Sequence, residues 1–130
     1  MVDKTIILKT FNKQFFDFIE DVNTIVENNT DIETSRIYFN TIKKSNPTIL
    51  LKLWHQYIFI PYKSQIHLGD ISFFLEKDYA HDLSNLPNNK EILKIIDTSL
   101  RNPIRNMSAI NKEHCMKYIQ LLCKLSDAYC

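Results

Sequence analysis

The chain contains few side chains whose type and spacing suit metal binding. The best candidate set is Asp78, His81 and Asp82, which would share one face of a helix. Asp82 is also typical of a residue that begins a loop or caps a helix, and no second group of ligands follows it. The sequence therefore predicts no metal site.

The other histidines and the cysteines are spaced for structure rather than for reaction. His114 and Cys115 are adjacent, so on a helix their side chains point about 100° apart and cannot act as a pair. Cys115 and Cys123 are interpreted as small apolar core residues, and three cysteines without CxxC spacing are typical of reduced thiols. His55 lies in a narrow polar strip, which is either a site of perturbed titration or, as we favour, a solvent-facing edge.

The carboxylate pairs of the sequence do not indicate catalysis either, and no phosphate-binding loop is expected. Glu20 with Asp21, and Asp31 with Glu33, occupy helix-surface and helix N-terminal positions, where carboxylates serve solvation and capping. The single glycine, Gly69, excludes a Gly-rich dinucleotide loop, a Walker-type loop and a nucleophile elbow. We therefore expect a protein that is not an enzyme, with no catalytic residues and no cofactor.

The elements that position these residues are predicted to be helices. Apolar residues recur at intervals of three and four, and the 130 residues, 45% of them apolar, suit one domain over residues 1–130. The expected helices span residues 8–26, 31–44, 47–68 with a bend or restart at Pro61, 71–75, 92–100 with a break near Pro103, and 108–129. Their expected caps are Thr30, Asn46, Gly69, Asp70 and Ser108. Residues 82–89 are expected to form a surface loop.

This pattern predicts an all-α fold: a compact single-domain bundle or orthogonal array of five to six helices. The segment Ile49–Ile60 is apolar nearly all round its axis. A helix of that kind is typical of the middle of a bundle. We therefore expect it to be the most buried element, with Trp54 in the core.

Exposed aromatic side chains are the main indication of function. Phe16 lies at the margin of an apolar stripe, and Phe74 follows Phe73 on a short helix. Aromatic residues flanked by charges are typical of an interface centre and its polar rim. The candidate protein-binding residues are Phe16, Glu20, Phe74 and Lys77. Burial of both aromatics under other helices is the alternative.

The predicted function is a non-enzymatic module that binds another protein or itself, with a homodimer as one form. The alternative is nucleic-acid binding through the basic faces of the third, fifth and sixth helices. Its candidate residues are Lys43, Lys44, Lys63, Arg101 and Arg105. The net charge of only +1 gives little long-range attraction to nucleic acid, which favours a protein partner.

Four segments resemble proteins of one group: residues 15–21, 44–54, 69–79 and 116–126. Over nearly its whole length the chain is similar to short, uncharacterised helical proteins of giant nucleocytoplasmic DNA viruses of the mimivirus type. The resemblance implies no activity; it implies the cytoplasm of an infected cell, a virus factory or the virion. Many Ile, Lys and Asn residues and few Gly, Ala and Arg residues agree with an AT-rich viral genome.

Targeting signals are not expected from the sequence. Residues 1–10 lack the basic start and long apolar stretch of a signal peptide. The longest uncharged run, Leu53–Tyr62, has ten residues and is too short to span a bilayer. We therefore expect a cytoplasmic protein without a membrane partner.

Overall fold

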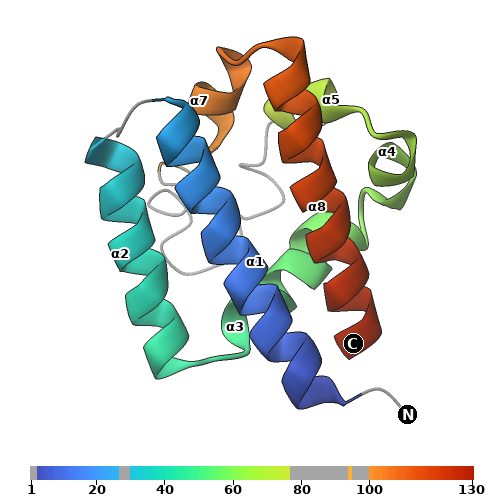
Figure 1. Ribbon diagram of the computed structural model, residues 1–130. Coiled ribbons are helices and arrows are strands. Elements are labelled where there is room, and N and C mark those ends of the chain that lie inside the picture. Colours follow the sequence, from blue (N-terminus) through green and yellow to red (C-terminus); the bar gives the residue numbers. More distant parts are fainter. Residues whose placement is uncertain (1–2, 27–29, 77–93, 95–99) are drawn as a thin grey trace.

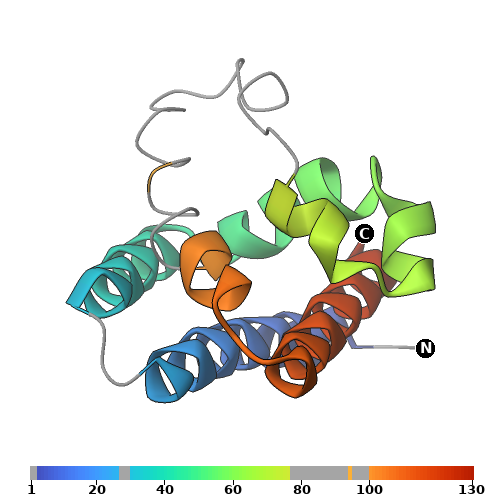
Figure 2. The ribbon, with the colours of Figure 1, turned by 90° about the horizontal axis from the view of Figure 1, so that it is seen from above.

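The computed structural model describes residues 3–26, 30–76, 94 and 100–130, and the fold is all-α. Helix α1 (Lys4–Ile25) lies between α2 (Thr30–Ser45) and the antiparallel α8 (Ala109–Tyr129) (Figure 1). Figure 2 shows α3 (Ile49–Trp54), α5 (Ile71–Glu76) and α7 (Asn102–Arg105) on one side of α1 and α8. Between α3 and α5 come the π-helical turn η1 (His55–Phe59) and α4 (Lys63–Leu68). Within the described ranges, no helix combines the length and the apolarity needed to cross a bilayer.

Helix α1 is the centre of the packing. The carboxylate of Asp3 accepts a hydrogen bond from the backbone N–H of Thr5 at 2.9 Å and caps its first turn. Its buried stripe keeps helical spacing and faces α8, α2 and α3: Ile7, Phe11, Phe15, Phe18, Ile19 and Val22. Because α8, α2 and α3 all contact α1, this stripe is buried, whereas Ile6 on the opposite face is 62% exposed.

The segment expected to be most buried lies instead at one side of this packing. In α3 and η1 only Leu50 and Leu51 are buried, Trp54 is half-buried, and no residue of η1 is buried. The prediction of a fully enclosed central helix is therefore wrong. Among the described helices, α3 packs against α1, α2 and α8, and η1 packs against α8, and these contacts cover only part of the apolar surface of the segment.

The start and end of this segment also differ from the expectation. Helix α3 begins at Ile49, two residues beyond Pro47, whose carbonyl accepts a hydrogen bond from the side chain of Asn12 at 3.0 Å. At η1 the backbone N–H of Ile60 donates to the carbonyl of His55 at 3.0 Å, an i to i+5 bond that widens the turn before Pro61. His55 is half-buried and stacks on Phe59 rather than forming a solvent-facing edge.

The corner between α4 and α5 agrees with the prediction. Gly69 ends α4 with φ 72° and ψ 26°, the left-handed conformation that costs glycine little. The carboxylate of Asp70 accepts the backbone N–H of Ser72 at 3.1 Å and caps α5. Ser108 likewise caps α8 by accepting the N–H of Asn111 at 3.2 Å, which confirms the predicted start.

Two arginines join α5 to α7. Nη2 of Arg101 donates to the carbonyl of Leu75 at 2.8 Å, and Nη2 of Arg105 donates to the same oxygen. Pro103 lies in the first turn of α7 instead of breaking a helix. The predicted loop at 82–89 and most of the helix predicted at 92–100 lie outside the described residues.

Candidate functional site

A groove of about 460 Å³ lies between the α4–α5 corner and the N-terminal half of α8. The left-handed turn at Gly69 places the end of α4 and the start of α5 along one wall. The other wall is one face of α8, whose lining residues recur at helical spacing. The groove is lined by Leu68, Gly69, Ile71, Ala109, Lys112, Glu113, Met116, Lys117 and Gln120.

The apolar part of this groove is accessible to a partner. Leu68 and Ile110 are the most exposed large apolar side chains in the described part of the chain, at 77% and 79%. Ile110 lies on the stripe of α8 that contains Glu113 and Lys117, three and seven residues later. Met116 is buried beneath them. The groove thus has the apolar residues Ile71 and Met116 in its lining and one exposed large apolar side chain, Leu68, in its wall, while Ile110 lies outside the lining, next to Ala109 on α8.

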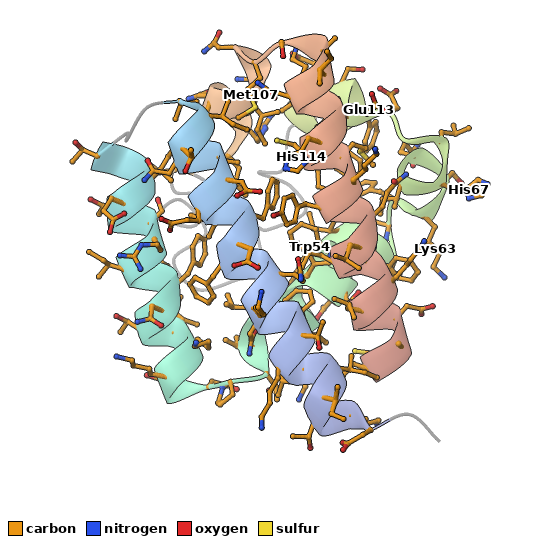
Figure 3. All side chains as sticks on the ribbon, in the orientation of Figure 1. Trp54, Lys63, His67, Met107, Glu113 and His114 are labelled. Atoms are coloured by element: carbon orange, nitrogen blue, oxygen red, sulfur yellow. The ribbon has the colours of Figure 1, made fainter. Side chains whose placement is uncertain are left out.

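The polar part of the groove is formed by α8. Among the described residues, neither Lys112 nor Lys117 nor Glu113 forms an ion pair within 4.0 Å. Figure 3 shows Glu113 on the side of α8 turned toward α4, and His114 on the side turned toward α1. The amide of Gln120 donates to the carbonyl of Ile66 at 2.9 Å and ties α8 to α4. Two cations and one anion are therefore available to a bound segment.

A second polar cluster lies on the opposite side of α8, against α1. The carboxylate oxygen Oδ2 of Asp21 accepts the hydroxyl of Tyr118 at 2.6 Å and lies 3.2 Å from Nε2 of His114. Burial and the carboxylate of Asp21 raise the pKa of Tyr118 well above its ordinary value. The ring of Tyr118 also stacks on Phe18 at 5.1 Å. These contacts fasten α8 to α1.

The sequence analysis did not identify this cluster, because Asp21 was interpreted as a surface carboxylate. Its only local signal is the spacing of His114 and Tyr118, which are four residues apart and so share a helix face. The partner on α1 lies nearly a hundred positions earlier, and no local pattern indicates that contact.

The buried cysteines confirm their interpretation as core residues. Sγ of Cys123 accepts the indole N–H of Trp54 at 3.2 Å, and Sγ of Cys115 lies 3.7 Å from Sδ of Met107. Burial raises the pKa of each thiol to about 11. Both thiols therefore stay protonated at neutral pH and are poor nucleophiles.

The structure does not form the predicted aromatic patch. Phe74 is buried, only 6% exposed, against Tyr62 and Phe73, so its predicted outward position is wrong. The reason is that Phe74 shares a helix face with Ile71 and Leu75 and turns inward with them, which leaves Phe73 at the edge.

The other members of that candidate set are also placed differently. Phe16 is half-buried, with the ammonium of Lys43 5.0 Å from the centre of its ring. Glu20 is exposed, 4.0 Å from the guanidinium of Arg36. Lys77 lies outside the described residues. Phe16 and Glu20 are thus on the α1–α2 surface, away from α5.

The predicted nucleic-acid residues do not form one face. Lys43 and Lys44 lie in the last turn of α2, and Lys63 begins α4 at the far side of α8 (Figures 1 and 3). Lys63 lies over the ring of Phe59 at 5.3 Å. Arg101 and Arg105 bind the carbonyl of Leu75, as described above, at the end of the molecule opposite the last turn of α2.

The metal-ligand spacing noted in the sequence, Asp78, His81 and Asp82, lies outside the described residues. Within the described part of the chain, no three His, Cys, Asp or Glu side chains are grouped to hold a metal ion. Comparison of the chain with protein-family models, with curated proteins and with solved structures finds no match.

Proposed function

We propose that the protein is a non-enzymatic interaction module that binds a segment of a partner protein in the groove between α4, α5 and α8. The observation that supports this is the exposure of Leu68, at 77%, in the wall of a groove of about 460 Å³ that also contains Ile71 and Met116. Covering apolar surface contributes about 25 cal/mol per Å². Exposed apolar residues gathered at a groove with a polar rim are typical of a docking surface.

The charges of the groove favour a different protein over a second copy. In a two-fold dimer the same patch faces itself, so a lining with two lysines and one glutamate would lie against a second lining of the same net positive charge. Only Glu113 among the lining residues would offset this repulsion. A heterologous partner avoids that cost.

The proposed setting is the cytoplasm of an infected cell, a virus factory or the virion. Support comes from the resemblance of the sequence to giant-virus proteins and from its AT-rich composition. An antibody against the protein, applied to purified virions and to fractions of infected cells, tests this setting. Detection only in uninfected cells would contradict it.

Site-specific photo-cross-linking tests the docking function. A photoreactive residue at Leu68, which lines the groove, or at Ile110, which follows the lining residue Ala109 on α8, should cross-link one defined protein in extracts of the native cells. The matched control is Ile37, which is 58% exposed on α2, on the other side of α1. The control position should give no such product.

The captured segment is then prepared as a synthetic peptide. It should bind the wild-type protein and lose binding to Leu68→Asp, while Ile37→Asp binds normally. Circular dichroism checks that both variants remain helical. Equal cross-linking at all three positions, or none at Leu68 and Ile110, would contradict a docking function for this groove.

A further inference from the structure

We infer that the segment bound in this groove is an acidic amphipathic helix; this inference rests on the proposed docking function. Two independent properties of the groove support it: the backbone of its walls and the charge of its rim.

The walls favour a helix over an extended strand. A strand gains affinity by pairing its backbone with a free sheet edge. Here both walls are formed by helices, and in the turn between α4 and α5 the backbone N–H groups of Gly69 and Asp70 already donate to the carbonyl of Gln65 at 3.1 and 3.3 Å. An occupant must therefore satisfy its own backbone, which a helix does.

The lining face of α8 has the length that a short helix needs. From Ala109 to Gln120 the axial distance is about 16 Å, or three turns. A helix laid along this face presents apolar residues at i, i+4 and i+7 to the floor formed by Leu68, Ile71 and Met116.

The rim favours carboxylates on that helix. Lys112 and Lys117 both line the groove, against the single Glu113. The neighbouring carboxylate of Asp70 accepts the N–H and the hydroxyl of Ser72 at 3.1 and 2.6 Å and so faces its own helix. A partner with acidic residues beside its apolar stripe complements both lysines, whereas a basic helix meets repulsion.

A helix library tests the inference directly. The library is displayed on phage, with Leu at i, i+4 and i+7 and with flanking positions free to be Glu, Gln or Lys. Selection on the wild-type protein should enrich Glu at the flanks. Selection on Leu68→Asp should enrich nothing, because the apolar wall is lost.

The binding constants of one selected acidic peptide for variants of the protein then show which charged residues contribute to binding. The double variant Lys112→Glu/Lys117→Glu should bind about tenfold more weakly. The control Lys9→Glu/Lys44→Glu makes the same change of net charge at exposed positions of α1 and α2 and should bind like the wild type. Glu113→Gln should bind about twofold more tightly, since it removes the one carboxylate among the described lining residues.

Three outcomes would overturn the acidic helix. In the first, selection on the wild-type protein enriches no helix, or enriches Lys at the flanking positions. In the second, the same helices are enriched on Leu68→Asp. In the third, both lysine double variants weaken binding of the selected peptide equally.

Anionic phosphatidylserine vesicles serve as a competitor. Vesicle binding that depends on Leu68 without peptide enrichment would assign the groove to a membrane surface and also overturn the inference. If Leu68 cross-links one defined segment and that segment is not acidic, the docking function still stands, but the inference that the bound segment is an acidic helix is wrong.

Discussion

At the scale of single residues, the contact between Asp21 and Tyr118 shows how one polar pair can define an interface. The carboxylate accepts a short hydrogen bond of 2.6 Å from the hydroxyl, while the ring of Tyr118 packs on Phe18. A phenol beside a carboxylate resists ionisation, because a second negative charge would be repelled in a partly desolvated place. The raised pKa of Tyr118 therefore keeps its hydroxyl protonated, and able to donate to Asp21, across the neutral pH range.

Asp21→Asn should lower the pKa of Tyr118 toward its ordinary value. Burial, the largest cause of the upward shift, remains in the variant, but the charge of Asp21 is removed. An NMR titration of the Tyr118 ring signals, assigned with Tyr118→Phe, measures the change. Asp127→Asn, on the exposed end of α8, is the control. An unchanged titration in Asp21→Asn would show that the two side chains are not in contact in solution.

At the scale of elements, the α4–α5 corner forms a wall of the groove. Gly69 takes φ 72°, and the N–H of Asp70 closes the end of α4 on the carbonyl of Gln65. A Cβ added at Gly69 would lie 3.5 Å from Nε2 of Gln120, an ordinary contact. The requirement for glycine is therefore conformational and not a matter of space.

Gly69→Ala should reduce the free energy of unfolding by about 1 kcal/mol, because an L-residue is strained in the left-handed conformation. Gly69→Asn should cost less, since asparagine tolerates this conformation. Chemical denaturation of the two variants measures the difference. If alanine and asparagine cost the same, the left-handed turn is not what limits this position.

At the scale of the whole molecule, the two buried thiols make stability depend on alkaline pH. Cys115 on α8 contacts Met107, and Cys123 lies against Trp54, so the two sulfurs belong to different parts of one core. Burial raises both pKa values from 9.0 to about 11 in the folded protein. Above pH 9 the unfolded chain therefore holds fewer protons at these sites than the folded chain, and unfolding becomes easier.

The free energy of unfolding should accordingly fall as the pH rises from about 9 to about 11, by roughly 2 to 5 kcal/mol for the two thiols together. Urea denaturation at a series of pH values measures this slope. Cys115→Ala/Cys123→Ala has a lower stability at neutral pH but should show a shallower decline over the same window. Identical slopes would mean that the thiols do not titrate differently on folding.

Local features of the chain were sufficient for the helical class and for several boundaries. The caps at Ser108, Asp70 and Gly69 were predicted because each acts on the backbone within three or four residues of itself. The core residues of the two long helices, among them Phe11, Phe15 and Leu122, follow from spacing for the same reason. These properties depend on short-range geometry, which the order of residues specifies directly.

The sequence by itself thus determined that this chain is helical and where most of its described helices begin or end. Tertiary structure alone decided which apolar faces are covered: Phe74 and Phe73 are equally apolar, yet Phe74 is buried, and Ile49–Ile60 is apolar nearly all round, yet only Leu50 and Leu51 of it are buried. It also decided that Leu68 and Met116 border one groove and that Asp21 meets Tyr118. The physical reason is that burial depends on which helices pack together in space, and that choice is made between segments far apart in the chain.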